Sequence, residues 1–534
     1  MKILFKLSLV AALLVFQNQE SHAQRTNAES TTEKFNTLLY YIEHMYVDSV
    51  DSEELVATAI RKMLEELDPH SVYISKEELK EVNEPLNGNF EGIGVQFNIL
   101  KDTIFIVSPI IGGPSEKLGI VAGDKIITIN GENVAGIGIT NPDVMSKLKG
   151  PKGTQVNVGI KRKGAKELIE FPIIRDKIPI YSVDASYMAE PGVGYIKISR
   201  FAKTTTQELR DALQKLNSQG MQTLVLDLQN NGGGLLNSAI EMSDEFLSGN
   251  KLLVYTEGRA FPKEESLASH EGLFEKGKLI VLIDEGSASA SEIVTGAVQD
   301  WDRGMVIGRR SFGKGLVQRP VSLPDGSAVR LTVQKYYTPV GRCIQKPYEE
   351  GSEAYQREKY ERFEKGELFS LDSLNLPDSL KYFTKVKKRA VYGGGGILPD
   401  IFVPIDTSMN STYYADLVRN GVVNSFCLTY ADQHRAELLK TFANDDDFVK
   451  RFEITKDIMD KMIAQGVSSE VPFVAQDFET SKRGLELRMK ALIGRNLYEP
   501  GTFYKVINVL NPAYMKALEV LKDGTFNKMK LASN

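Results

Sequence analysis

The sequence of 534 residues has little of several residue types, and each shortage excludes a class of protein. Its two cysteines, Cys343 and Cys427, are too few for a disulfide-dense scaffold, and we expect them to stay unpaired. The net charge of −5 provides no general basic field, which argues against a nucleic-acid partner. The His-Glu-x-x-His spacing of a zinc site does not occur, so we expect neither a metal nor another cofactor.

Long apolar runs are confined to the N-terminus. Two lysines flank the beginning of the chain, residues 7–16 are apolar, and a small-x-small sequence ends at Ala23. This order predicts a secretory signal peptide, residues 1–23, which is cleaved after Ala23. The alternative is an uncleaved anchor, but the apolar run is shorter than the roughly 20 residues that span a bilayer. We therefore expect an exported protein without a membrane span after cleavage, with the periplasm as its compartment and the extracellular space as the alternative.

The whole chain is 42% apolar and 25% charged, as in globular proteins, and is long enough for several domains. Apolar residues at helical spacing predict a helical region over 24–89. Short β-rich runs over 90–176 indicate a small separate domain. From 177 to 405, buried strand patterns alternate with helices, which is typical of a largely parallel sheet in an α/β core. A polar surface insertion covers about 346–388 of this core, and residues 406–534 are predicted to form a helical C-terminal region.

The run IGRRSFGKGLVQRP, residues 307–320, places Lys314 between two glycines. From Gly308 onward it is almost a phosphate-binding loop, which would make the protein a nucleotide hydrolase. That loop requires Ser or Thr after the lysine and a helix whose N-terminus holds the phosphate. Here Gly315 follows, and the next residues have the pattern of strands. The nucleotide hypothesis is therefore disfavoured.

A second run, GSASASEIV, contains Ser287, Ser289 and Ser291 between a predicted buried strand and a helix. A serine at such a junction lies at the carboxyl end of the sheet, where the amides of the new helix point toward whatever the serine attacks. A hydroxyl needs a base, and the histidines of this chain have no triad-like context. A lysine with a pKa lowered by burial can replace histidine, and Lys314 follows the next strand. The alternatives are helix capping for the serines and a solvated turn for the lysine.

The motifs LDLQNNGGG, SASASEI and FGKGLVQ, in this order and spacing, resemble those of the carboxyl-terminal processing (tail-specific) serine proteases. LDPHS, GDKIITINGENV, YYTPVGRCIQKPY and GGGGILPD resemble the same family, so the resemblance covers about residues 35–405. It implies that Ser289 is the nucleophile, that Lys314 is the general base, and that Gln318 orients the lysine.

The resemblance also implies an oxyanion hole. It would consist of the amide of Ala290 and that of a glycine in the NNGGG run, with Gly234 as the preferred match and Gly233 as the next. Gly232 stands where the family commonly has proline, so we expect a looser turn with the same amides. We leave two acidic residues, Asp227 and Glu292, out of the catalytic set.

The β-rich domain over 90–176 resembles the family's PDZ domain. Its GIGV loop can offer consecutive amides to a chain-terminal carboxylate, and the strand that follows can pair with a peptide. The helix NPDVMSKL would line the groove. The predicted peptide-binding residues are Gly92, Ile93, Gly94, Val95, Val144 and Leu148. The alternative is a domain that only packs against the core.

The resemblance thus implies a serine endopeptidase that uses a Ser-Lys dyad and cleaves protein or peptide substrates recognised through their free carboxyl termini. The alternative from another class is a non-catalytic PDZ adaptor with a protease-like fold. The intact set of Ser289, Lys314 and Gln318 argues against an adaptor. The sequence leaves open the substrate, the role of the C-terminal region, and whether a homo-oligomer or a regulatory partner is involved.

Overall fold

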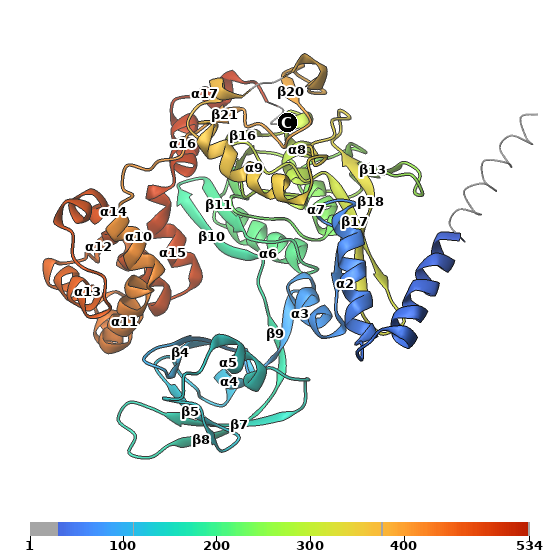
Figure 1. Ribbon diagram of the computed structural model, residues 1–534. Coiled ribbons are helices and arrows are strands. Elements are labelled where there is room, and N and C mark those ends of the chain that lie inside the picture. Colours follow the sequence, from blue (N-terminus) through green and yellow to red (C-terminus); the bar gives the residue numbers. More distant parts are fainter. Residues whose placement is uncertain (1–29, 111, 375–376, 532–534) are drawn as a thin grey trace, which may run out of the picture.

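The computed structural model describes residues 30–110, 112–374 and 377–531, and Figure 1 shows their arrangement. The predicted signal peptide lies outside the described residues. A helix over 30–45 is followed by α2 (Ser52–Glu65), the short strand β1 (Val72–Ile74) and α3 (Lys76–Asn87). Asp51 caps α2, and Ser75 and Glu78 form a capping box at the start of α3.

The β-rich unit is attached to the rest of the chain by two paired strands. β2 (Asn89–Gly92) enters it and β9 (Asp176–Pro179) leaves it, and the two are antiparallel neighbours. Between them lies an antiparallel sheet in the order β3-β4-β5-β7-β8, with β6 beside β5. The strands are β3 (Val95–Ile99), β4 (Ile104–Pro109), β5 (Lys125–Ile129), β6 (Glu132–Asn133), β7 (Gln155–Lys161) and β8 (Ile169–Ile174), and the helices are α4 (Pro114–Lys117) and α5 (Asn141–Leu148).

The core contains the largely parallel sheet that the sequence predicts. Its order is β10-β11-β12-β15-β16-β21; β10 is antiparallel to β11, and the other neighbours are parallel. The fold class is therefore confirmed. The strands are β10 (Val183–Glu190), β11 (Val193–Ile198), β12 (Thr223–Asp227), β15 (Lys278–Ile283), β16 (Met305–Gly308) and β21 (Ile401–Phe402).

Helices cover both faces of this sheet. One face packs against α6 (Thr205–Ser218), α7 (Leu236–Asp244) and α8 (Ala290–Asp300) in a single apolar cluster. The other face packs against α16 (Pro512–Lys522) and α17 (Thr525–Lys528), at the end of the chain. The last part of the C-terminal region thus completes the core.

A second sheet lies beside the core helices and joins distant parts of the chain. It has the order β1-β18-β13-β14, with β17 also paired to β18. N-terminal strand β1 is therefore a neighbour of β18, the second strand after Lys314. The additional strands are β13 (Leu252–Glu257), β14 (Glu264–Leu267), β17 (Leu316–Ser322) and β18 (Ala328–Tyr337).

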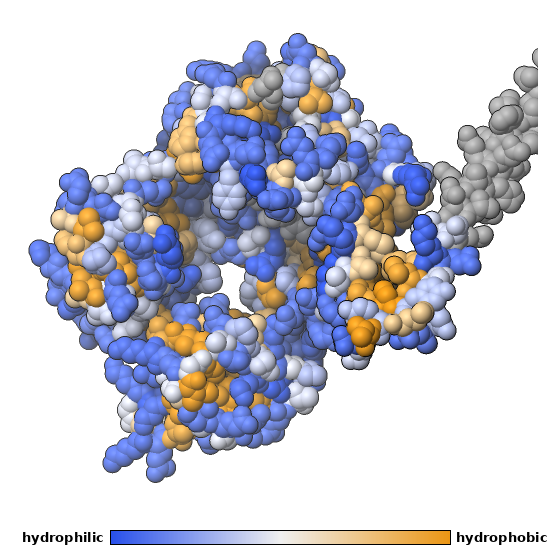
Figure 2. Space-filling model, in the orientation of Figure 1, coloured by the Kyte–Doolittle hydropathy of each residue, from blue (hydrophilic) through white to orange (hydrophobic). Residues whose placement is uncertain are grey.

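The remaining C-terminal helices form a unit with its own apolar core. They are α10 (Thr412–Arg419), α11 (Val422–Thr441), α12 (Asp445–Arg451), α13 (Lys456–Ser468) and α14 (Ala475–Leu497), and α15 (Pro500–Ile507) connects them to β10. The polar insertion contains α9 (Ser352–Glu364) and β19 (Lys381–Phe383), and β20 (Ala390–Tyr392), which pairs with β19, follows it. Figure 2 shows an opening that is bounded by the core, the β-rich unit and the C-terminal helical unit.

Candidate active site

Ser289 lies at the junction between β15 and α8, at the carboxyl end of the parallel sheet, as the sequence predicts. Its backbone has φ 56° and ψ −113°, a conformation that a residue with a Cβ seldom adopts. Such strain persists only where the surroundings enforce it, and it is common at nucleophile turns. Here the buried Asp284 accepts the amides of Asn230 and Gly286 at 2.8 and 2.9 Å and so joins the serine loop to the glycine loop.

The glycine loop after β12 lies directly against Ser289. A Cβ added at Gly233 would stand 2.8 Å from the Ser289 Cβ and 2.9 Å from the Ala290 nitrogen, so only glycine fits there. The Gly233 amide donates to the Asn231 side chain at 2.9 Å. Within the part of the chain that the structure describes, the amides of Gly234 and Ala290 have no acceptor. These two N–H groups are therefore available to an oxyanion, whereas that of Gly233 is engaged.

Lys314 lies in the loop between β16 and β17 and is half-buried. Burial lowers the pKa of its ammonium group, and the nearby positive charge of Arg330 lowers the pKa further. The carboxylates of Asp68 and Glu292 act in the opposite direction and raise the pKa. A lysine with a lowered pKa is neutral in a larger fraction of molecules near neutral pH, and a neutral amine can accept a proton.

Gln318 is connected to the N-terminal LDPHS motif through one side chain. Its Nε2 donates to Thr332 Oγ1 at 3.3 Å, and this hydroxyl donates to Asp68 at 3.0 Å. Asp68 is buried and also accepts the Ser71 hydroxyl at 2.6 Å. Sequence patterns alone do not bring this carboxylate to Thr332, because the two residues are 264 positions apart. Asp68 is thus a site residue that sequence reasoning missed.

Glu292, in the first turn of α8, is fully buried and joins the Ser289 loop to the Lys314 loop. It accepts the amides of Ser289, Gly313 and Lys314 at 2.8, 2.7 and 2.9 Å, and it also accepts the Ser311 hydroxyl. Burial raises the pKa of this carboxyl, whereas the four hydrogen bonds lower it. Its contacts indicate a positioning role rather than a part in proton transfer, and the helix dipole alone would not have shown them.

Asp227 lies outside this arrangement. Asp227 is occupied by hydrogen bonds from the Tyr195 hydroxyl at 2.7 Å and Lys197 Nζ at 3.0 Å, which hold the end of β12.

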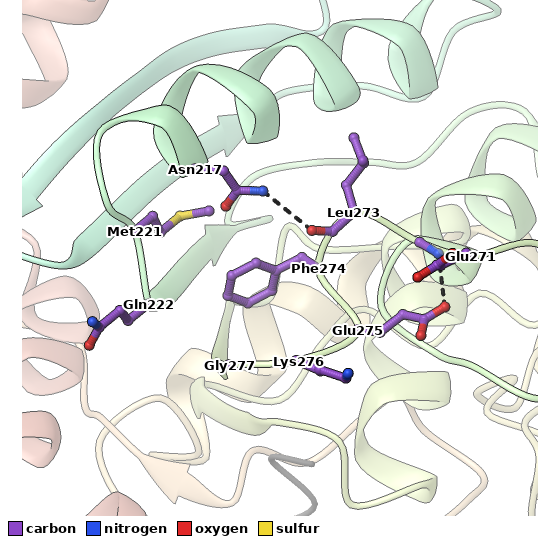
Figure 3. Close-up of a pocket in the computed structure, with 10 residues that line it drawn as sticks. Asn217, Met221, Gln222, Glu271, Leu273, Phe274, Glu275, Lys276 and Gly277 are labelled. Atoms are coloured by element: carbon purple, nitrogen blue, oxygen red, sulfur yellow. Dashed lines mark hydrogen bonds between the residues drawn. The ribbon is translucent and has the colours of Figure 1, made fainter.

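Figure 3 shows a cavity of about 410 Å³ lined by residues that include Gln222, Phe274 and Gly277. Because it lies just before β12 and β15, it is at the amino ends of these strands, opposite the serine. Among residues 30–110, 112–374 and 377–531, His, Cys, Asp and Glu side chains form no metal-binding group.

The predicted peptide loop of the β-rich unit follows β2 and borders β3, whose other edge is unpaired among the described strands. Gly92 lies near the backbone of Leu148 and Lys149, so the GIGV loop meets the C-terminal end of α5. Val144 is fully buried and Leu148 is 5% exposed, both within the core of the unit. These two side chains therefore support the groove from below and offer little surface to a peptide. The free edge of β3 is the part that could pair with one.

A backbone-strained serine at a strand-helix junction, two free amides beside it and a lysine of lowered pKa define a serine-type peptidase on an α/β core. Comparisons with known proteins give the same result. The model of peptidase family S41 matches residues 192–351, and a PDZ-domain model matches 92–173. The activating protease CtpB N-terminal domain matches 10–78, and a family of unknown function, DUF8443, matches 413–499.

Curated relatives extend the match over most of their length. The chain is 37% identical over 322 residues to the carboxy-terminal processing protease CtpA of Bacillus subtilis, covering 60% of this chain and 68% of the relative. It is 36% identical over 367 residues to CtpB of the same organism, covering 68% and 73%. The solved photosystem II D1 C-terminal processing protease is 32% identical, with 58% and 83% covered and a TM-score of 0.34. The chain belongs to the carboxy-terminal processing proteases of peptidase family S41.

Proposed function

We propose that this protein is an exported serine endopeptidase that uses Ser289 and Lys314 as a catalytic dyad and selects substrates by their carboxyl-terminal tails. The dyad is supported by the observation that three loops, those of the NNGGG run, Ser289 and Lys314, lie together at the carboxyl end of one sheet. The glycine loop touches Ser289, and Glu292 connects Ser289 to the Lys314 loop. Gln318 lies four residues after the lysine and belongs to the same site.

The proposed reaction uses these groups in sequence. Ser289 Oγ attacks the scissile carbonyl while the neutral Lys314 amine takes the hydroxyl proton. The amides of Ala290 and Gly234 hold the negative oxygen of the tetrahedral intermediate. Lys314 then gives its proton to the leaving amine, and the acyl ester on Ser289 is hydrolysed by a water that Lys314 deprotonates. Gln318 holds the lysine in orientation, supported by Thr332.

The PDZ domain would supply substrate selection. Its GIGV loop can receive a terminal carboxylate, and the free edge of β3 can add the preceding residues as a strand. The opening between the core, the PDZ domain and the helical unit gives an extended chain a route from this domain to the core. No described helix is both long and apolar enough to cross a membrane. Export, the periplasm, and any homo-oligomer or regulatory partner belong to this proposal.

A digestion assay tests the dyad. The chain from Gln24 is incubated with an unstructured protein that ends in an apolar tail, beside Ser289→Ala, Lys314→Ala and the control Lys335→Ala. Lys335 is an exposed lysine of β18, so its variant should cleave like the parent. Loss of cleavage in both dyad variants, with the control active, is the expected result. Cleavage that survives Ser289→Ala or Lys314→Ala would overturn the dyad.

The adaptor alternative makes a different prediction in the same experiment. An adaptor would bind a tail peptide through residues 90–176 and leave the substrate intact in the parent and in all variants. The amides of Gly234 and Ala290, which remain free beside Ser289, favour the enzyme, because an adaptor has no use for them.

A further inference from the structure

The polar insertion after the core strands packs against the loop of Lys314. Helix α9 has the composition of a solvent-exposed helix, and most of its side chains are exposed. Tyr355 and Arg362, however, are only 2% and 3% exposed, and Glu358 between them is half-buried. Spacings of three and four residues place these side chains on one face of the helix. The insertion therefore has a buried face.

Arg362 on this face holds the backbone that precedes Lys314. Its Nη1 donates to the carbonyl of Ser311 at 2.8 Å, and its Nη2 donates to that of Phe312 at 2.9 Å. Its Nε donates to Glu358 at 2.6 Å, which fixes the plane of the guanidinium. A lysine in this place could not donate to both carbonyls in a fixed plane.

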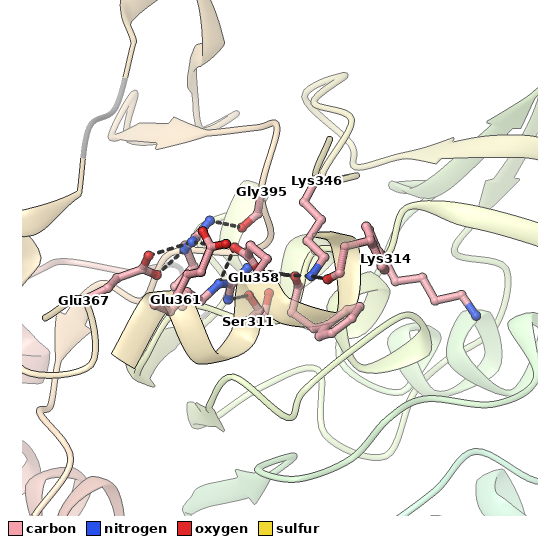
Figure 4. Close-up of polar contacts among 12 residues, drawn as sticks. Ser311, Lys314, Lys346, Glu358, Glu361, Glu367 and Gly395 are labelled. Atoms are coloured by element: carbon pink, nitrogen blue, oxygen red, sulfur yellow. Dashed lines mark hydrogen bonds and ion pairs between the residues drawn. The ribbon is translucent and has the colours of Figure 1, made fainter. Parts of the chain in front are cut away.

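Lys346 continues this set of contacts to the next residue. Its amide donates to the carbonyl of Gly313 at 2.9 Å, and its Nζ donates to Glu358 at 2.9 Å. Three consecutive carbonyls, those of residues 311–313, thus receive donors from the insertion and the segment that leads into it. Figure 4 shows these contacts on one side of the loop, while the Lys314 side chain extends away from them.

The loop belongs to no sheet, so its hydrogen bonds go to other parts of the chain. Residues 310–315 lie between β16 and β17 and belong to no helix or strand. Glu292 binds the amides of Gly313 and Lys314 from the side of the nucleophile helix. Arg362 binds the carbonyls of Ser311 and Phe312, whose amides donate to the carbonyls of Ile397 and Ser287. The backbone just before the lysine is therefore held by several contacts, and those of Arg362 come from a side chain of the insertion.

We propose that Arg362, oriented by Glu358, is a positioning residue for the general base, and that α9 is the element that fixes Lys314 relative to Ser289. This inference rests on the proposed role of Lys314. Arg362 donates to Glu358 and to the carbonyls of Ser311 and Phe312, so its effect is exerted through the loop. A displacement of about 1 Å in a reacting group can lower a rate by about 100-fold.

The test compares Arg362→Met with the parent and with the control Arg357→Met. Arg357 lies on the exposed face of α9, with a side chain that is 62% exposed. The measurements are kcat and KM on the tailed substrate, the pH dependence of kcat/KM, and Tm. We expect Arg362→Met to lower kcat at least about tenfold while KM changes less than about threefold. Arg357→Met should match the parent.

The pH profile separates positioning from general loss of structure. A loosened loop admits water to Lys314, which raises the pKa of the ammonium toward its ordinary value, so the acid limb of kcat/KM should move to higher pH. A variant that merely unfolds in part would lose amplitude without this movement. The charged and titratable groups that face the lysine stay the same in both variants; they are Asp68, His70, Glu292 and Arg330.

Other outcomes distinguish a failure of the proposal for Arg362 from a failure of the proposed dyad. If Arg362→Met has the kcat and the acid limb of the parent while Lys314→Ala is inactive, only the proposal for Arg362 is overturned. Activity in Lys314→Ala overturns the dyad and this proposal together. If Arg362→Met does not fold, Arg362→Lys and Glu358→Gln replace it. A folded replacement with parent kcat and acid limb overturns the proposal, and one with lower kcat and a displaced limb supports it.

Discussion

Replacement of Glu292 by glutamine tests whether one buried carboxylate holds the Ser289 loop and the Lys314 loop together. Each of its oxygens accepts two hydrogen bonds: one binds the amides of Ser289 and Lys314, and the other binds the Gly313 amide and the Ser311 hydroxyl. A glutamine side chain has one oxygen and one NH2 group. Whichever way it is turned, at least one backbone N–H loses its acceptor and faces another donor.

The size of the effect follows from these contacts. A hydrogen bond to a charged group contributes about 1.5–3 kcal/mol, and a buried donor left without a partner costs about 1–3 kcal/mol. Glu292→Gln keeps the acceptors on its remaining oxygen, so we expect a local cost of about 2–5 kcal/mol. At about 1.4 kcal/mol for each factor of ten, local opening of the lysine loop should become about 30- to 4,000-fold more frequent.

Hydrogen exchange measures this opening directly. The amides of Gly313 and Lys314 are followed by mass spectrometry in a peptide that covers 310–316, in the parent, in Glu292→Gln and in the control Glu353→Gln. The Glu353 side chain is 88% exposed, so its variant should exchange like the parent. Cleavage activity should fall in Glu292→Gln because the lysine loses its fixed position. Parent exchange rates in the 310–316 peptide of Glu292→Gln would refute the reasoning.

Two further predictions concern the LDPHS motif. Asp68→Asn removes a negative charge that raises the pKa of Lys314, so the acid limb of kcat/KM should move to lower pH. The value of kcat should also fall, because Gln318 loses the support that Asp68 gives through Thr332. An acid limb that stays in place would contradict this prediction. His70 has a pKa lowered to about 4 by burial and by the nearby Lys314, so the unfolded chain takes up its proton near pH 6.5, well before the folded protein does. Stability should therefore fall as pH decreases from about 6.5 to about 4, by up to about 3 kcal/mol before solvent screening is considered. The Tm of His70→Gln should vary less with pH than that of the parent or of His434→Gln, and equal pH dependence in all three would exclude this role.

The local parts of the site could be predicted from the sequence. Each small-residue loop directly follows a buried parallel strand, and parallel strands end at a common edge. This rule brings the NNGGG loop, Ser289 and Lys314 together without any knowledge of side-chain contacts. Among the described residues, Asn231 engages the Gly233 amide and no acceptor engages that of Gly234, and the sequence could show neither.

The contacts that join distant segments could not be predicted. Apolar spacing predicts that α16 has a buried face, but it does not name the sheet that covers that face. The pairing of β1 with β18 depends on strand register, and it is this pairing that brings Asp68 to Thr332. Periodicity describes one element at a time, whereas these contacts are decided by the arrangement of several elements.

The contacts of the insertion around α9 could not be predicted from the sequence either, and these contacts reach the loop of Lys314. The many charged residues of the insertion predict a surface helix, and the prediction is correct for the outer face. Composition averages over both faces of α9, so it does not show that Arg362 is buried and donates to two carbonyls of the Lys314 loop. In the proposed arrangement, a carboxylate on α8 and a guanidinium from the insertion hold the Lys314 loop, and a carboxylate from the N-terminal motif raises the pKa of the lysine. Since these groups lie far apart in the sequence, changes outside the core strands should alter the rate of cleavage without altering any residue that touches the substrate.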